Sequence, residues 1–403
     1  MTKYKHYMLA TILALLGLTQ TFAQGLNFDS GSDGSDGAIN ITVSEEYPLP
    51  ADGIINATTV TVDAGTTLTF TRNEFNTPVY LLATGDVVIN GIINVSGAAG
   101  NDSVGGRGGP GGFDGGTPGS AGVSPGDGFG PGGGQSGTNV NNNAAGAGAG
   151  SYANSGSAGS STGKGASYGS ALLIPMIGGS GGGGTSGSPG KGGGGGGGAL
   201  LIASDTQIEL ASTGEILANG GRYYSNAYNG GSGGAVRLVA PNVFGSGDIR
   251  AESRRNDNLL SGDTYAGFGR IRVDTIDRSG LNTITFDPSA YSSVGSNMVV
   301  FPTPTPRLDL VEVAGTNIAV DESQAVFVDL PFNADPNRTV TVQATDFNKI
   351  VYITVVLQPV NGDRITYDDS IDNSGGGSTS KAINVVFPVN TQTKVFVWTR
   401  PDP

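Results

Sequence analysis

Residues 97–198 hold 42 of the chain's 70 glycines, very few charged side chains and only 12 large apolar ones. Ordering a backbone of this length costs far more conformational entropy than so few apolar side chains can return on burial. A conventional hydrophobic core is therefore excluded for this tract.

Two states remain possible for the tract. One is a mobile coil. The other is a set of extended glycine helices with three residues per turn that hydrogen-bond laterally to one another. Glycine occupies every third position from Gly178 to Gly196 and from Gly106 to Gly115, which favours packed helices. The apolar island 171–177 interrupts the tract, and we expect it to dock as a strand.

A repeated β unit surrounds the tract. When Ala83, Ala203 and Ala240 are placed in one column, the residues two and four positions earlier are apolar in all three segments. This period of two predicts strands, and each segment is followed by a glycine and a second alternating strand. Such strands bury an apolar face only by stacking. The pattern predicts an all-β fold, a right-handed parallel β-helix over residues 24–300 interrupted by the glycine-rich insertion 97–198.

Two shorter insertions, 220–234 and 252–267, stand at equivalent places in later units. All three insertions should therefore leave the same side of the stack. On the outward positions we expect a solvated strand face with charges that alternate along the strands. Its members are Asp248, Arg250, Glu252, Arg270, Arg272 and Asp274.

The N-terminus predicts export. Lys3 and Lys5 precede an apolar run over 8–18, and small residues before Gln24 form a cleavage site, so residues 1–23 read as a removable signal peptide. No later segment is long and apolar enough to span a membrane as a helix. We expect an exported protein that is extracellular, surface-bound or periplasmic, and with no cysteine it has no disulfides.

Charge and composition exclude several functions. The net charge of -13 becomes -15 once Lys3 and Lys5 are removed, which disfavours nucleic acid as a partner. The only histidine, His6, leaves with the signal peptide. A mature chain without His or Cys cannot use a Ser-His-Asp or Cys-His nucleophile or an ordinary zinc site.

The C-terminal part follows a proline-rich linker at 301–306. Six β-rich segments over 307–403 predict an immunoglobulin-like β-sandwich without its disulfide. They begin near Leu308, Ala325, Thr339, Ile350, Lys381 and Lys394. Trp398, the only tryptophan, is expected to be a core or edge residue rather than a platform for sugars.

Calcium is the one metal that the residues suggest. Asp29, Asp33 and Asp36 stand in a loop rich in oxygen ligands and turn residues, although the spacing matches no established calcium loop. The alternative is an acidic, flexible start to the mature chain. A second acidic loop is expected around Asp363, Asp368, Asp369 and Asp372.

The repeated strands carry a resemblance. Over residues 26–300 the chain resembles the pectin-lyase-like group, whose hydrolases rely on clustered aspartates and a histidine. The mature chain has no histidine and no such aspartate pair on a strand, and Arg270 with Arg272 is only a faint counterpart of the group's basic substrate-binding strand.

The full layout resembles uncharacterised exported bacterial glycine-rich proteins with an adhesin-like β-helix and a C-terminal Ig-like domain. The glycine tract is similar to the glycine-helix bundles of phage tail-fibre adhesins, whose tips bind cell surfaces. The resemblance to the exported glycine-rich proteins covers nearly the full chain but brings no assigned activity with it.

The sequence therefore predicts a non-catalytic exported protein in surface adhesion, extracellular matrix or envelope structure. Its partner would be a cell-surface or extracellular polysaccharide or protein, met by the glycine-rich face. The alternatives are a carbohydrate-active enzyme that uses carboxylates, and a calcium-dependent polysaccharide-binding protein. No other cofactor is expected.

Overall fold

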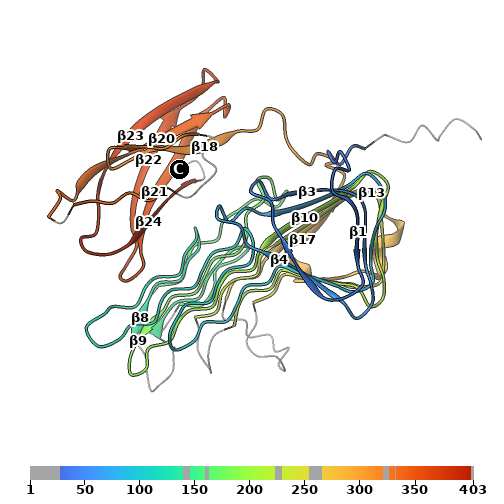
Figure 1. Cartoon of the computed structure of the whole chain (residues 1–403), viewed down its shortest axis with the longest axis horizontal. Helices are drawn as coiled ribbons and strands as arrows, with labels where there is room; N and C mark the ends of the chain where they lie inside the picture. Colours follow the sequence, from blue (N-terminus) through green and yellow to red (C-terminus); the bar gives the residue numbers. More distant parts are fainter. Residues whose placement is uncertain are drawn as a thin grey trace, which may run out of the picture.

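The computed structural model describes residues 28–138, 146–158, 163–222, 229–253, 266–320, 326–331 and 333–400. Within these ranges the chain is all-β, with parallel sheets in the N-terminal part and antiparallel sheets in the C-terminal part (Figure 1). Its short helical turns are Ser279–Thr283 and Ser289–Tyr291. None of the helices in the described ranges could cross a membrane. The predicted signal peptide, 1–23, lies outside the described residues.

The N-terminal strands pair in parallel in a nine-stranded sheet and a six-stranded sheet, and the pairings of the larger sheet fall into two groups, so we describe three parallel stacks. The first stack contains β3 (Ile54–Val62), β5 (Val79–Ala83), β10 (Ala199–Ser204), β13 (Ala235–Gly245), β15 (Arg270–Asp277) and β17 (Ser292–Gly295). The second contains β1 (Gly37–Ile41), β6 (Val87–Ile89), β11 (Gln207–Leu210) and the later halves of β3 and β13. The third contains β2 (Glu45–Pro48), β4 (Thr67–Thr71), β7 (Ile92–Asn94), β12 (Glu215–Leu217), β14 (Asp248–Arg250) and β16 (Thr285–Asp287).

The predicted alignment of the repeat is wrong by one residue in β10. Ile202, not Leu201, pairs with Leu81 and Leu238 and shares the inner core with them, and Ser204, not Ala203, pairs with Ala83. Leu201 and Ala203 face the other way, into a second apolar layer. Every residue from 199 to 203 is apolar, so periodicity could not choose between the two faces.

The first stack is buried on both sides. Its inner side faces the main core, and its outer side is covered by Phe28, Val300, Tyr152, Leu173 and Met176. Leu173 and Met176 come from the apolar island, which therefore docks as expected but forms no strand.

The prediction that the charged outward positions are exposed to solvent is wrong at Asp274. Arg237 and Asp274 are fully buried, and the Arg237 guanidinium donates to Asp274 Oδ2 at 3.0 Å. Arg272 donates to the other carboxylate oxygen at 2.6 Å. The covering segment near Asn297, which also bonds Asp274, removes this cluster from water. Arg250, by contrast, stays partly exposed beside Asp248.

The glycine tract is a bundle of laterally hydrogen-bonded segments. Along 192–199, backbone N–H groups three residues apart donate to the same neighbouring segment. The N–H groups of Gly192, Gly195 and Gly198 donate to Asn101, Ala98 and Val95 at 2.8, 3.0 and 2.7 Å. Those of Gly193, Gly196 and Ala199 donate to Gly116, Phe113 and Pro110, and those of Gly194 and Gly197 donate to Asn229 and Ser232. A period of three matches a helix with three residues per turn, so the packed alternative, and not the mobile coil, describes residues 97–138, 146–158 and 163–198 of the tract.

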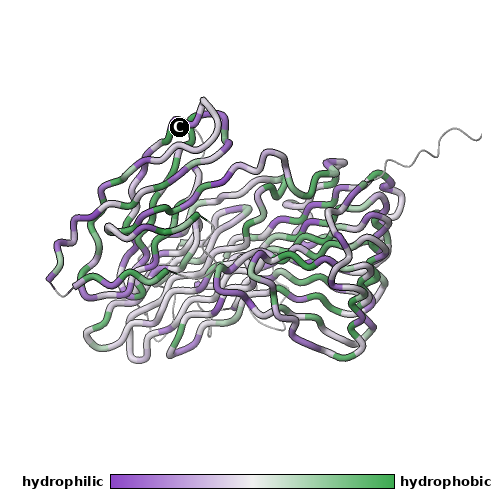
Figure 2. Tube along the Cα trace, turned by 45° about the horizontal axis from the view of Figure 1, so that its top comes forward, coloured by the Kyte–Doolittle hydropathy of each residue, from purple (hydrophilic) through white to green (hydrophobic). Residues whose placement is uncertain are grey.

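Glycine is required inside the bundle because neighbouring backbones pass too close for a side chain. A Cβ built on Gly193 would lie less than 3.0 Å from the carbonyl oxygens of Gly182 and Gly183. Figure 2 shows the bundle as a pale region of intermediate hydropathy beside the green core of the coils.

All three insertions leave the same corner of the stack, as predicted. They follow β7, β12 and β14 of the third stack and return to the first. Gly97 N donates to Asn219 O at 2.8 Å, and Gly220 N donates to Glu252 O at 2.7 Å, so the insertions bond one another. Residues 223–228 and 254–265 of the two shorter insertions lie outside the described ranges.

The C-terminal part contains two antiparallel sheets around a shared apolar core. One sheet contains β18 (Arg307–Val313), β19 (Thr316–Asn317), β20 (Asn337–Thr345) and β23 (Ser378–Val386), and the other contains β21 (Ile350–Pro359), β22 (Ile365–Asp372) and β24 (Thr393–Thr399). The strand expected near Ala325 is wrong for the described residues 326–331, where Phe327 is 81% exposed. Strand β22 was not predicted, because its acidic residues suggested a loop.

The close packing of the bundle gives a stability prediction. Gly193→Ala should lower the free energy of unfolding by about 1–3 kcal/mol, because its methyl group has no room between backbones. Gly375→Ala is the control, since a Cβ there meets nothing within 4 Å. Denaturant titration of both variants measures the difference, and equal stability would contradict close packing.

Candidate functional site

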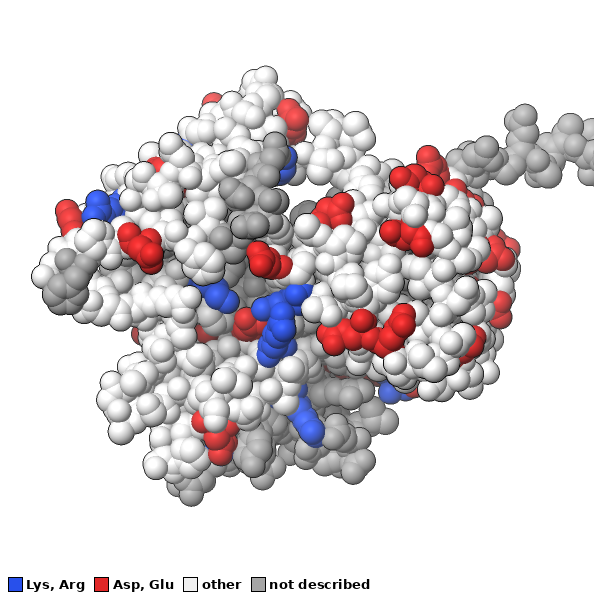
Figure 3. Space-filling view, in the orientation of Figure 1, with Lys and Arg blue, Asp and Glu red and all other residues white. Residues whose placement is uncertain are grey.

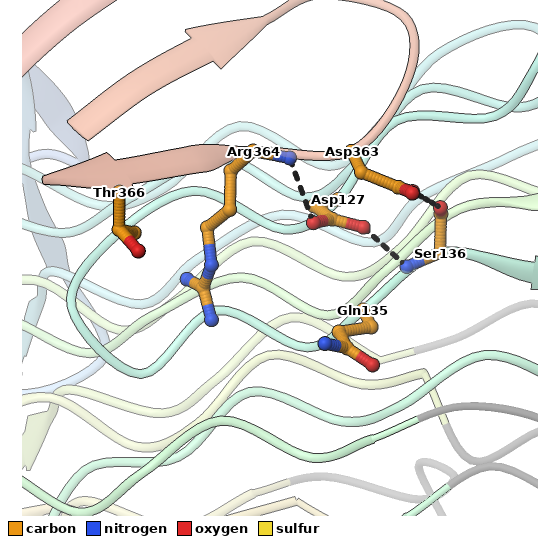
Figure 4. Close-up of a pocket in the computed structure, with 6 residues that line it drawn as sticks. All are labelled: Asp127, Gln135, Ser136, Asp363, Arg364 and Thr366. Carbon is orange, nitrogen blue, oxygen red and sulfur yellow. Dashed lines mark hydrogen bonds between the residues drawn. The ribbon is translucent and has the colours of Figure 1, made fainter.

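A polar groove lies between the glycine bundle and the outer side of the sheet β22-β21-β24. Its volume is about 500 Å³. Figure 4 shows the six side chains that line it, three from the bundle and three from the chain around the start of β22. They are Asp127, Gln135, Ser136, Asp363, Arg364 and Thr366. We call this the interface groove.

Asp127 joins the two walls of the groove. Its carboxylate is almost fully buried, and Oδ1 accepts the Ser136 N–H at 2.6 Å while Oδ2 accepts the Arg364 N–H at 3.1 Å. A buried carboxylate needs such partners. Asp127 therefore acts as a fixed link between bundle and sheet.

Arg364 reaches from the sheet into the bundle. Its guanidinium donates to the carbonyl oxygens of Gly130 and Gly133 at 3.2 and 3.1 Å. Burial lowers the pKa of Arg364, and the charge of Asp127 opposes that shift. No carboxylate lies within ion-pair distance of Arg364 in the part of the chain described here. A guanidinium has five N–H donors, so these two bonds leave donor capacity on a side chain that lines the groove (Figure 4).

The remaining groove residues are more open to solvent. Gln135, Asp363 and Thr366 are exposed and Ser136 is half-buried. The Ser136 hydroxyl donates to Asp363 Oδ1 at 3.3 Å, and Gln135 Oε1 accepts the Gly163 N–H at 2.8 Å. The groove is thus lined by both donors and acceptors, and all six of its lining side chains are polar or charged.

Three hydrogen bonds to backbone carbonyl oxygens beside the groove hold its two walls together. Thr117 Oγ1 donates to Val360 O at 2.7 Å, Asn361 Nδ2 donates to Ser124 O at 3.1 Å, and Gly362 N donates to Pro125 O at 3.1 Å. The sheet is therefore docked on the bundle over a continuous surface, rather than merely tethered by the proline-rich segment 301–306.

An aromatic cluster seals the other side of this contact. Phe396 and Trp398 of β24 stack with ring centroids 5.1 Å apart, and Phe113 of the bundle meets Trp398 edge-on at 5.7 Å. Phe129 contacts Phe396, and the Lys394 ammonium lies 4.9 Å from the Phe129 ring centroid. Trp398 is half-buried on the edge strand β24, as expected of a core or edge residue.

Asp114 ties three parts of the chain together. Arg72, just after β4, donates to both its carboxylate oxygens at 2.6 and 3.2 Å, and Lys394 of β24 lies 3.7 Å away. Burial alone would raise the pKa of Asp114, but the hydrogen bonds and charge of Arg72, the Gly108 N–H and Lys394 outweigh it, so the pKa lies below its usual value. On the face of the molecule drawn in Figure 3, basic side chains gather in the middle and few charged side chains lie over the bundle.

The predicted calcium ligands lie far along the chain from the groove residues, in a segment that runs across the coils. Asp29, Asp33 and Asp36 accept the backbone N–H groups of Gly31, Ser35 and Asn56. Between them, the hydroxyls of Ser30 and Ser32 donate to Ala83 O and Ala57 O, each at 2.9 Å, on successive coils. The segment is thus an ordered strap rather than a flexible start. The described residues contain no group of three metal-binding side chains, and the calcium site stays a prediction.

The second acidic loop is wrong as a loop. Asp368, Asp369 and Asp372 lie on β22, and only Asp363 precedes it. Asp369 pairs with Lys381 Nζ at 2.6 Å, and Asp368 accepts a hydrogen bond from Thr354 at 2.6 Å. Only Asp363 lines the interface groove.

Sequence reasoning missed five of the six groove residues, namely Asp127, Gln135, Ser136, Arg364 and Thr366. The available indication was the rarity of charge in the glycine tract, where a lone Asp127 needs a partner. The position of that partner, more than 200 residues later, has no local pattern.

No family model matches this chain, and neither the curated proteins nor the solved structures contain a match.

The aromatic cluster gives a fluorescence prediction, since Trp398 is the only tryptophan. Phe113→Ala should shift Trp398 emission to longer wavelength and lower the free energy of unfolding by about 1–3 kcal/mol, because it opens the contact to water. Phe327→Ala removes an exposed ring and is the control. Unchanged emission in Phe113→Ala would mean that the sheet does not dock on the bundle.

Asp114 gives a pH prediction. A carboxyl whose folded pKa is depressed stabilises the fold above its unfolded pKa of about 3.9, and this contribution is lost as the pH falls through the folded pKa. Stability should therefore fall with acidification below about pH 4. Asp114→Asn should be less stable at pH 7 and lose less on acidification, measured by Trp398 emission in urea. An identical pH slope in both proteins would contradict this role.

Proposed function

We propose that this chain is a non-catalytic exported protein that acts in surface adhesion, extracellular matrix or envelope structure. The observation that carries the proposal is the bundle, which is bonded laterally to several neighbours and contains almost no side chains inside. Such a body is stiff, because moving one segment breaks hydrogen bonds to several others. Stiffness, a net negative charge and few reactive side chains on the bundle suit a load-bearing or contact role.

We also propose the finer fold. Three parallel stacks connected in chain order fit a right-handed parallel β-helix, since parallel crossovers are right-handed in nearly all known cases. Two packed antiparallel sheets fit an Ig-like sandwich. Both support the resemblance to exported glycine-rich bacterial proteins with an adhesin-like β-helix, and to glycine-helix bundles of phage adhesins.

The contact face of the bundle needs one revision. The C-terminal sheet covers the flank that carries Phe113, Asp127 and Gly130, so this flank meets the chain's own sheet. A partner would therefore use the uncovered sides of the bundle or the interface groove.

A hydrolase that uses Asp127 and Asp363 is less well supported. Asp127 is 2% exposed, and both its oxygens accept backbone N–H groups. A carboxylate held in this way is poorly placed to attack a substrate or to transfer a proton to it.

Cell binding tests the proposal. Labelled chain should bind the producing cells or their extracted polysaccharide, and Gly193→Val should bind less because it disrupts the bundle, while Gly375→Ala binds normally. The same polysaccharide should release no reducing ends. Release of reducing ends, or the absence of any binding, would overturn the proposal.

A further inference from the structure

We infer that the interface groove is a binding site for a neutral sugar unit of a glycan. The inference rests on the proposed function and names the ligand class of its contact. The volume of the interface groove, about 500 Å³, lies in the usual range of about 300–1,000 Å³ for small-molecule sites.

The side chains of the groove match the chemistry of vicinal hydroxyls. Each sugar hydroxyl donates one hydrogen bond and accepts others, so it needs donors and acceptors side by side. Arg364 supplies donors, Asp363 supplies an acceptor, and Thr366 supplies a hydroxyl that can do both. Asp363 uses one carboxylate oxygen for Ser136, which leaves the other oxygen for a ligand.

Charge selects a neutral ligand over an acidic one. Asp127 and Asp363 contribute two negative charges and Arg364 one positive charge, so the lining has a net charge of -1. An acidic sugar or a phosphate would be attracted by the one guanidinium but repelled by two carboxylates, so the balance of charge disfavours it. The polar lining also disfavours lipid, which would leave polar groups unpaired.

The groove is held in shape before any ligand arrives. Asp127 fixes both walls, and the Arg364 guanidinium is held by the carbonyls of Gly130 and Gly133. A site that is already ordered loses less entropy on binding. A ligand bound to the exposed groups of Asp363 and Thr366 would therefore lie against side chains that are already held in place.

The test uses the whole chain and soluble oligosaccharides. Titration calorimetry with neutral gluco-, galacto- and manno-oligosaccharides should find at least one that binds, and the corresponding uronic acid oligosaccharide should bind more weakly. Asp363→Asn and Thr366→Val should each weaken binding about tenfold, a loss of one good hydrogen bond. Asp52→Asn, an exposed carboxylate in a turn before β3, is the matched control and should bind as the unaltered chain does.

Three results would overturn the inference: no neutral oligosaccharide binds, the two groove variants bind normally, or the acidic sugar binds more tightly. Trp398 emission checks that the groove variants remain folded, and because they lie at separate positions, one suffices if the other misfolds. Sugar binding through the groove without binding to cells would retain the site and reject the proposed function. Cell binding that survives in both groove variants would retain the function and reject the site.

Discussion

Lateral hydrogen bonding between backbones governs this molecule. In the coils it joins strands of one turn to strands of the next, and in the insertions it joins glycine segments to several neighbours at once. A strand has only two hydrogen-bonded sides, whereas a helix with three residues per turn directs its N–H groups to three. The described segments of the glycine tract therefore pair many of their backbone polar groups with one another, which offsets part of the entropy cost that so few apolar side chains leave uncovered.

The coils and the bundle depend on each other. Each insertion starts at the end of a third-stack strand and returns at the start of a first-stack strand, so the coils set the spacing of the segments that enter the bundle. In return, Leu173 and Met176 from the tract cover the outer side of the first stack. Farther along the same outer side, the segment near Asn297 covers Arg237 and Asp274, which alternation places outside, so they are buried as an ion pair.

Strand positions and the shared corner of the insertions followed from periodicity and equivalent spacing. The register of β10 did not, because an apolar run has no polar residue to mark its outer face. The groove could not be predicted for a different reason. Asp127 and Arg364 meet through the docking of two bodies far apart in the chain, and local patterns carry no information on docking. The absence of a strand over the described residues 326–331 and the unexpected β22 have the same origin, since alternation alone does not identify which segments find a pairing partner.

The three-directional bonding of the bundle also bears on how such a molecule can change in size. A further glycine segment placed along an uncovered flank would form hydrogen bonds with the same three-residue repeat that joins the existing segments. Insertions can therefore lengthen by one out-and-back pair at a time while the coils that anchor them keep their dimensions. Growth on the flank held by Asp127 and Trp398 is blocked by the C-terminal sheet, so that sheet acts as a terminating layer on one side.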